Sequence, residues 1–369
     1  MEQSKRLLSL DTLRGFDMFF IMGGAGFFVA LNELFPNAFF GAIAAQMHHV
    51  SWHGFTQHDM IFPLFLFIAG ISFPFSLANS RSKGYSEKNI YLNIIRRGFT
   101  LVLFGMIYNG LLRFDFENLR CCSVLGRIGL AWMFAALIFL NTKTKTRVII
   151  SAAILILYWL LLAFVPVPDA AAGVDPFSKE GSWVGYIDRM ITPGKLIYPG
   201  VHDPEGLLST APAIVTALLG MFAGEIVRSK EIISENKKVV YLAVIGIALV
   251  IIGQLWNFAF PINKNLWTSS FVCFVGGLSF LLFALFYYLV DVKGWRKWTT
   301  FFVVIGMNSI TIYMAQRIVS FSGISNFFFG GFIGLFPETA QPFIGSVCYI
   351  ATCWIFLYIL YRKKIFLKV

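Results

Sequence analysis

The chain has 369 residues, of which 57% are hydrophobic and only 13% are charged, and it contains 41 Phe. Soluble domains carry about 25% charged residues, so this composition excludes an ordinary soluble domain and indicates an integral membrane protein. No ten-residue alternation of the kind that builds a membrane β-barrel repeats along the chain. The long apolar runs instead favour an all-α, polytopic bundle of transmembrane helices.

Ten apolar runs approach the length of about 20 residues that a membrane-spanning helix requires. The first run is too long for the apolar core of a signal peptide, and no small-residue cleavage motif follows it, so we expect it to remain as the first span. We treat residues 1–369 as a single integral-membrane domain. Its predicted spans are 8–31, 55–79, 92–112, 122–140, 147–165, 207–228, 238–258, 267–290, 299–320 and 343–361.

Lysine and arginine fall mainly in alternate connecting segments. If both termini are cytoplasmic, 22 of the 30 basic residues lie on the cytoplasmic side and six on the opposite side, while Arg127 and Arg317 remain inside spans. This asymmetry follows the positive-inside rule and supports ten spans. It also accounts for the net charge of +11, so no nucleic-acid partner is expected.

The first turns of the first span contain Asp11, Arg14 and Asp17. A carboxylate within a membrane helix suggests a functional site. The i,i+3 spacing nevertheless favours an ion pair between Arg14 and Asp17.

Four of the five histidines precede the second span, as His48, His49, His53 and His58, and Asp59 follows directly. Imidazole suits general-base work or the transient acceptance of an acyl group, and Asp59 is the natural carboxylate to orient it. The spacing alone leaves open a zinc or copper site built from this cluster, and also a set of merely interfacial polar residues. Neither HExxH nor a CxxC motif is present, so we expect no metal.

Polar residues also mark the outer ends of later spans. Arg127, in SVLGRIGL, could snorkel, pair with a carboxylate or bind an anionic ligand. HDPEGLLST either caps a helix or holds a polyhydroxyl or amine substrate, and the amides and indole of PINKNLW suit either a sugar or an interfacial turn. The candidate substrate-binding residues are Trp52, Arg127, Asp203, Glu205, Asn263, Asn265, Trp267 and Asn308.

Five segments occur together in the order SLDTLRGFDM, HVSWHGFTQHDMIFPLFLFIAG, SVLGRIGL, HDPEGLLST and PINKNLWTSSFV. Through them the chain, over about residues 6–361, resembles the heparan-α-glucosaminide N-acetyltransferase family. The resemblance implies a polytopic helical acyltransferase that takes acetyl from cytosolic acetyl-CoA and places it on a glucosamine amine across the membrane. It also implies that His49 is the active-site residue and that Asp59 matches an aspartate of the family motif.

The chain departs from the lysosomal members of that family. It has no lumenal domain before the first span, carries a Phe/Ala-rich insertion at about 32–47, and has Asp17 and a Gly23-Gly24 pair where the lysosomal form has an asparagine. We therefore expect a protein of the bacterial inner membrane. Its expected acceptor is free glucosamine, another amino sugar or the end of a cell-envelope glycan.

The combined hypothesis is that the pantetheine arm of acetyl-CoA reaches through the bundle to His49, which acts as general base or transient acetyl carrier. Arg14, Arg96 and Arg97 are the candidates for binding the CoA phosphates. The expected partners are acetyl-CoA, the amino sugar and the bilayer, with a homodimer left open. Two other functions also stay open: a transporter of amino sugars or oligosaccharides, and a metal-dependent membrane hydrolase that uses the histidine cluster.

Overall fold

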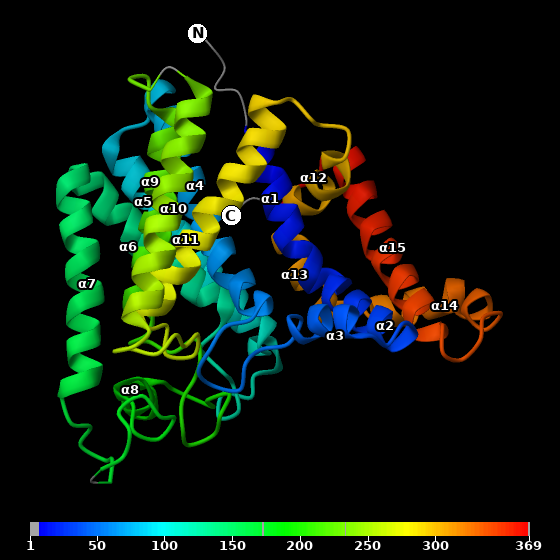
Figure 1. The fold of residues 1–369 in the computed structure, drawn as a ribbon, viewed down its shortest axis with the longest axis horizontal. Helices are drawn as coiled ribbons and strands as arrows, with labels where there is room; N and C mark the ends of the chain where they lie inside the picture. The colour runs from blue at the N-terminus through cyan, green and yellow to red at the C-terminus, as the bar shows by residue number, and fades with distance from the viewer. Residues whose placement is uncertain (1–6, 172, 233, 368–369) are drawn as a thin grey trace.

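The structure, a computed structural model, describes residues 7–171, 173–232 and 234–367. Three basic residues of the charge count, Lys5, Arg6 and Lys368, lie outside these ranges. Among the described residues, nine helices are long and apolar enough to cross a membrane, and a bent helix pair makes a tenth span. The predicted all-α polytopic bundle is therefore confirmed (Figure 1).

Each predicted span corresponds to a helix or a helix pair. The first span, Leu8–Leu34, combines α1 (Leu8–Phe19), the π-helical turn η1 (Phe20–Gly24) and α2 (Ala25–Leu34). The other spans are α4 (Gln57–Ser82), α5 (Glu87–Tyr108), α6 (Val124–Asn141), α7 (Thr144–Phe164), α9 (Thr210–Arg228), α10 (Glu235–Trp256), α11 with η3 (Ser269–Phe286 and Tyr287–Val292), α12 with α13 (Thr299–Met307 and Ser309–Ile318) and α15 (Gln341–Arg362).

Four shorter elements lie in the connecting segments. The segment between the fifth and sixth predicted spans, residues 166–206, contains a helix, and so does the segment between the ninth and tenth. These elements are α3 (Ala38–Ala45), η2 (Leu111–Arg113), α8 (Trp183–Ile191) and α14 (Phe321–Ile333).

The ninth span is not the continuous helix that its hydropathy predicts. α12 and α13 meet at Asn308 with a bend of 66°. The Asn308 carboxamide accepts a hydrogen bond from the Thr311 hydroxyl at 3.3 Å, and such local side-chain bonding competes with regular helix. The first span is also irregular, because Gly23 adopts a φ of 143° within η1.

Glycines allow close contacts between helices in the bundle. A Cβ added to Gly220 of α9 would lie 2.0 Å from the Phe67 carbonyl oxygen of α4, and one added to Gly15 of α1 would lie 1.7 Å from the Phe302 carbonyl oxygen of α12. Membrane helices that lack large interface side chains approach closely and gain van der Waals contact. α4 with α9 and α1 with α12 are therefore tightly joined pairs.

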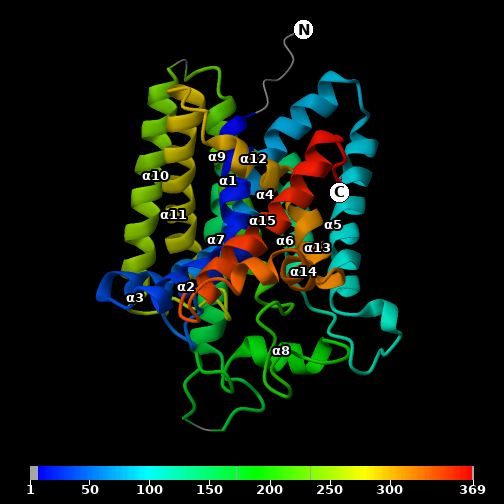
Figure 2. The same ribbon diagram turned by 90° about the vertical axis from the view of Figure 1, so that its right-hand side faces the viewer.

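The bundle has two distinct ends. α1 begins and α15 ends at the same end (Figure 2). Leu7 and Leu367 line one cavity. We call this end of the bundle the basic end, because the Lys/Arg-rich connecting segments lie there. At the opposite end, which we call the site end, α8 lies below the bundle and α4 begins (Figures 1 and 2).

The structure corrects the ion pair predicted in the first span. Arg14 pairs with Asp11 at 3.3 Å and donates to the Ser72 hydroxyl at 3.2 Å. Asp17 is instead buried in the bundle, and its Oδ2 has no hydrogen-bond partner among the described residues. Asp11 is preferred because it lies nearer the basic end, towards which an arginine side chain can extend.

Candidate functional site

Two segments that are distant in sequence meet at the site end. Residues 47–59 contain the clustered histidines and are called the histidine segment, and residues 257–268, called the 257–268 loop, join α10 to α11. The backbone N–H of Gly54 donates to this loop at 2.8 Å. Nδ2 of Asn263 lies 3.3 Å from Nδ1 of His53. The PINKNLW motif therefore packs directly against the histidine segment.

His49 and Asp59 form a close pair within the histidine segment. Nδ1 of His49 lies 2.7 Å from Oδ1 of Asp59. The carboxylate side chain is 1% exposed, whereas the imidazole is 52% exposed. Because the carboxylate favours a proton on Nδ1, Nε2 is the nitrogen left with a free lone pair. An accessible imidazole oriented by a buried carboxylate can act as a general base or a nucleophile.

The start of α4 fixes the orientation of Asp59. Its Oδ2 accepts hydrogen bonds from the Thr56 backbone N–H at 3.2 Å, the Thr56 hydroxyl at 2.9 Å and the Val50 backbone N–H at 3.4 Å. A carboxylate at the third helical position that bonds back to the N-cap residue is half of a capping box. The local sequence therefore directs Oδ2 to the backbone and leaves Oδ1 for His49.

Lys264 of the 257–268 loop reaches the same pair. Its Nζ lies 3.1 Å from Nδ1 and 3.3 Å from Nε2 of His49, and 3.5 Å from Oδ1 of Asp59. Burial lowers the pKa of Lys264, and the negative charge of Asp59 opposes that shift. A cation, a carboxylate and an imidazole thus lie together at this end of the bundle.

His58 and His53 have different surroundings. The His58 ring packs against the His49 ring with centroids 4.5 Å apart, and burial lowers the pKa of His53. Within the described residues, no group of three or more His, Cys, Asp or Glu side chains has the arrangement that holds a metal ion.

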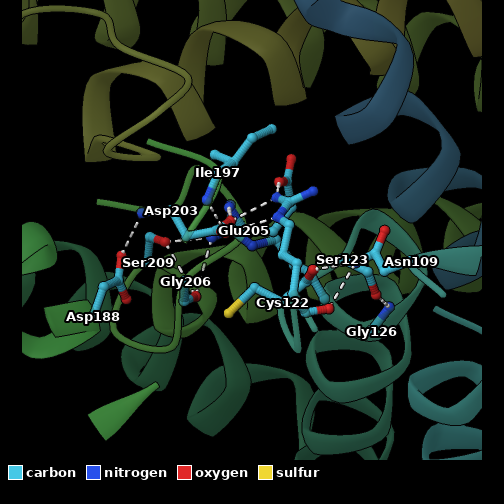
Figure 3. Close-up of polar contacts among 12 residues, drawn as sticks. Asn109, Cys122, Ser123, Gly126, Asp188, Ile197, Asp203, Glu205, Gly206 and Ser209 are labelled. Atoms are coloured by element: carbon cyan, nitrogen blue, oxygen red, sulfur yellow. Dashed lines mark hydrogen bonds and ion pairs between the residues drawn. The ribbon is translucent and has the colours of Figure 1, made fainter. Parts of the chain in front are cut away.

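A second polar cluster at the site end surrounds Asp203. Arg120 binds both carboxylate oxygens of Asp203 at 2.6 and 2.7 Å and also pairs with Glu205. Asp188 of α8 accepts the backbone N–H of Asp203 at 3.1 Å (Figure 3). It also accepts the backbone N–H of Leu207 at 3.1 Å. Asp203 therefore has a buried ion pair with Arg120, and its role in binding a substrate stays a prediction.

Burial and charge shift two pKa values in this cluster. Burial would raise the pKa of Asp203, but the hydrogen bonds and charge of Arg120 outweigh it and hold the pKa below its usual value. Burial raises the pKa of Asp188 to about 6, despite the two backbone donors. The cluster fixes residues 203–207 immediately before α9 begins.

Arg127 is buried beside this cluster. It donates to the Gly206 carbonyl at 3.1 Å and to the Ser209 hydroxyl, while its Nε and Nη1 have no hydrogen-bond partner in the described part of the chain. With Glu205 it lines a cavity of about 190 Å³. The two unpaired nitrogens are themselves buried, so they present no free donors to this cavity.

Trp267 does not have the exposed indole that sugar stacking requires. The side chain is 1% exposed, and Arg127 lies over its ring at 5.0 Å. Its Nε1 donates to the Thr216 hydroxyl at 3.2 Å. Trp267 therefore packs the core below the site, which corrects its predicted role in stacking on a sugar.

The other predicted contacts differ in their accessibility. Asn263 is fully buried, and its Oδ1 accepts the Leu266 N–H at 2.9 Å, so it mainly shapes the loop. Asn265 is partly exposed in the same loop. Trp52 is partly exposed, donates from Nε1 to the Phe177 carbonyl at 2.8 Å, and therefore links the histidine segment to the 166–206 segment.

His202 is buried against two aromatic rings. Its ring stacks on Tyr198 with centroids 4.8 Å apart and meets the edge of Trp52 at 5.1 Å. Neither of its ring nitrogens has a hydrogen-bond partner within the described ranges. Burial lowers the pKa of His202 to about 4, so the ring is neutral at neutral pH.

A larger cavity, of about 970 Å³, opens at the basic end. Three basic residues line it: Arg14, Lys83 and Arg97. Asn308 also lines this cavity, which groups it with the basic end instead of the predicted sugar site. Arg96 does not line it and instead borders two neighbouring cavities of about 640 and 450 Å³.

A narrow apolar cavity continues from the large one into the bundle. The two share the lining residues Phe65, Leu125, Ile128, Ser309 and Ile310. The narrow cavity also touches the α4 residues Ile61 and Phe62, less than one helical turn beyond Asp59. The large cavity therefore extends towards the start of α4.

Sequence reasoning did not assign three residues of these clusters. Lys264 was visible only as part of PINKNLW, and Arg120 and Asp188 stood in connecting segments without a motif of their own. A basic residue between the amides of a conspicuous loop motif is a signal that could have identified Lys264. Nothing in the sequence pattern marks Arg120 or Asp188.

Comparisons with known proteins support the resemblance seen in the motifs. The chain is 29% identical to the Homo sapiens heparan-alpha-glucosaminide N-acetyltransferase over 417 aligned residues, which cover 99% of this chain and 60% of that protein. It is 29% identical to the Mus musculus protein of the same name over 375 residues, covering 87% of this chain and 56% of that protein. The chain thus spans less than two thirds of the length of these curated relatives. No family model matches it.

Proposed function

We propose that this chain, which is similar to heparan-alpha-glucosaminide N-acetyltransferases, is a membrane-embedded acetyltransferase. It moves acetyl from acetyl-CoA, bound at the basic end, to the amine of a glucosamine-type amino sugar at the site end. The observation that carries the proposal is the 2.7 Å contact between a half-exposed His49 and a buried Asp59, opposite a large cavity lined by cations.

The cavity at the basic end suits the donor. Arg14, Lys83 and Arg97 supply positive charge for the phosphates of CoA, and guanidinium groups in particular bind phosphate through paired N–H donors. The narrow continuation, of about 40 Å³, presents only apolar surface and would widen to admit the donor. A thin pantetheine arm, which is part apolar and part amide, is compatible with that lining.

His49 performs the proton transfer. Asp59 holds the proton on Nδ1, so Nε2 removes a proton from the acceptor amine as its nitrogen attacks the thioester carbonyl carbon. The new N–C bond forms, the C–S bond breaks, and CoA leaves as the thiolate, which is then protonated. In the covalent variant, Nε2 itself attacks first and the acetyl-imidazole passes acetyl to the amine.

The acceptor is held on the site-end side of His49. Glu205 and Arg127 line the cavity of about 190 Å³, and the Glu205 carboxylate, which pairs with Arg120, suits the ammonium group of an amino sugar. Trp52 and Asn265 are the partly exposed residues of the predicted set that complete this region.

The test incubates purified protein with acetyl-labelled acetyl-CoA and then adds glucosamine. Wild-type protein is expected to transfer label to the amine, and His49→Ala is expected to lose that transfer. His48→Ala, a change at the exposed neighbouring histidine, is the matched control and should remain active. Normal transfer by His49→Ala would refute the assignment, while glucosamine uptake by vesicles without acetyl-CoA consumption would favour a transporter.

A further inference from the structure

We propose that Lys264 is a catalytic residue that stabilises the oxyanion formed during acetyl transfer. This inference rests on the proposed function. The ammonium of Lys264 lies 3.1 and 3.3 Å from the two ring nitrogens of His49. The thioester carbonyl that reacts beside Nε2 must then place its oxygen close to this ammonium.

The electrostatic need for such a group follows from the chemistry. When the amine attacks the carbonyl carbon, the C=O π electrons move to oxygen, and a negative charge develops there. When the C–S bond breaks, the electron pair on oxygen re-forms the C=O double bond, and the sulfur leaves as the thiolate. A donor already aimed at the oxygen lowers the barrier without reorganising at the moment of reaction. The same oxygen carries the charge in the direct and the covalent route, so the role of Lys264 is common to both.

A purely structural role for Lys264 does not account for the contacts. Asp59 already accepts hydrogen bonds from His49, from Thr56 and from the Val50 backbone. The Lys264 ammonium lies 3.1 and 3.3 Å from the ring nitrogens of His49, and 3.5 Å from Oδ1 of Asp59. It is therefore closer to the imidazole than to the carboxylate. A buried carboxylate with this many donors needs no further cation to satisfy it.

The backbone around Lys264 is held rigidly. The Lys264 carbonyl accepts the Trp267 N–H at 3.1 Å, and the Asn263 carbonyl accepts the Thr268 N–H, also at 3.1 Å. Oδ1 of Asn263 accepts the Leu266 N–H, and Asn263, Leu266 and Trp267 are all buried. The buried side chains on both sides fix the position from which the Lys264 side chain extends, as preorganisation requires.

The local environment strengthens the donor. The Lys264 side chain is 16% exposed, and burial lowers its pKa. A more acidic ammonium is a stronger hydrogen-bond donor, and the lower dielectric of a buried site increases the effect of its charge. The negative charge of Glu205 opposes this lowering of the Lys264 pKa, and the positive charge of Arg127 adds to it.

The test compares three variants of the full-length protein in the labelled acetyl-transfer assay. Lys264→Met is expected to lower kcat about 100- to 1,000-fold, as loss of an oxyanion donor does elsewhere, with KM for acetyl-CoA nearly unchanged. Lys264→Arg is expected to regain part of the loss. Lys195→Met removes an exposed lysine from the same end and should behave as wild type.

A chemical rescue separates catalysis from folding. Lys264→Cys treated with 2-bromoethylamine carries an ammonium at nearly the original distance and should regain activity, while identically treated wild-type protein controls for the native cysteines. Lys264→Met should keep a melting temperature within a few degrees of that of wild type, which shows that the fold is retained.

Two results would overturn the inference: a kcat of Lys264→Met within tenfold of that of wild type, or no recovery of activity on aminoethylation of Lys264→Cys. Failure of the proposed function is distinguishable, because it would appear as full activity in His49→Ala.

Discussion

Replacing Asp59 by Asn tests the tautomer argument with almost no change in shape. Oδ2 of Asp59 faces three donors, on Thr56 and Val50, whereas Oδ1 faces His49. Asparagine satisfies the three donors only by placing its carbonyl oxygen there. Its NH₂ group then points at Nδ1 of His49, which must accept the hydrogen bond and give its proton to Nε2. The variant therefore holds the imidazole in the tautomer without a free Nε2 lone pair.

The expected loss of kcat is large because Nε2 of His49 can no longer act as the base. Misdirecting the tautomer of a catalytic histidine costs about 10⁴-fold in kcat where it has been measured in unrelated enzymes, which corresponds to about 5 kcal/mol of barrier. The effect on folding should be much smaller. Removing a negative charge at a helix N-terminus costs about 0.3–1 kcal/mol, so the thermal midpoint should change by only a few degrees.

Thr56→Ala provides the matched comparison. It removes the N-cap side chain of α4 and should cost about 1 kcal/mol of stability, while leaving Asp59 and His49 in contact. The assay measures kcat for transfer of labelled acetyl to glucosamine, with the melting temperature of each purified variant. If Asp59→Asn retains more than a tenth of wild-type kcat, or if Thr56→Ala loses as much, the tautomer explanation is wrong.

Two further predictions concern folding. His202 is neutral in the fold because burial holds its pKa at about 4, whereas an unfolded histidine titrates near 6.5. Between these pH values only the unfolded state binds the proton, so stability is full above about pH 6.5 and falls, by up to about 3 kcal/mol, as pH drops to 4. His202→Phe should reduce this loss in melting curves at pH 7.5 and 5, and equal losses in both proteins would contradict the argument. Gly220→Leu, which places Cβ 2.0 Å from the Phe67 carbonyl oxygen, should lower the melting temperature markedly, whereas Gly26→Leu, where the added atom meets nothing within 4 Å, should not.

The span positions could be predicted because hydropathy and helix length are local properties. Their exact ends could not, since caps and polar first turns extend helices beyond the apolar run. The third span illustrates this: Ser86 caps α5 through its hydroxyl, so the helix begins several residues before the predicted start. The break at Asn308 was also missed, because one amide barely changes the mean hydropathy of a span.

Within the site, the pairing of His49 with Asp59 was accessible from sequence because ten residues separate them and a helix start fixes their geometry. The pairing of Lys264 with His49 spans 215 residues, and that of Arg120 with Asp203 spans 83. Such contacts depend on how the helices pack, which no local pattern reports. The burial of Trp267 was missed for the same reason, since an indole near a membrane interface is usually exposed to it.

The glycine contacts join four helices of the bundle in two pairs. α4 and α9 meet at Gly220 without intervening side chains, and α1 and α12 meet likewise at Gly15. Residues of α1, α4 and the end of α12 line the large cavity, together with residues of α5, α6 and α13. A displacement of one pair against the other would change the width of this cavity, and the helix breaks at Gly23 and Asn308 are places where the chain can bend.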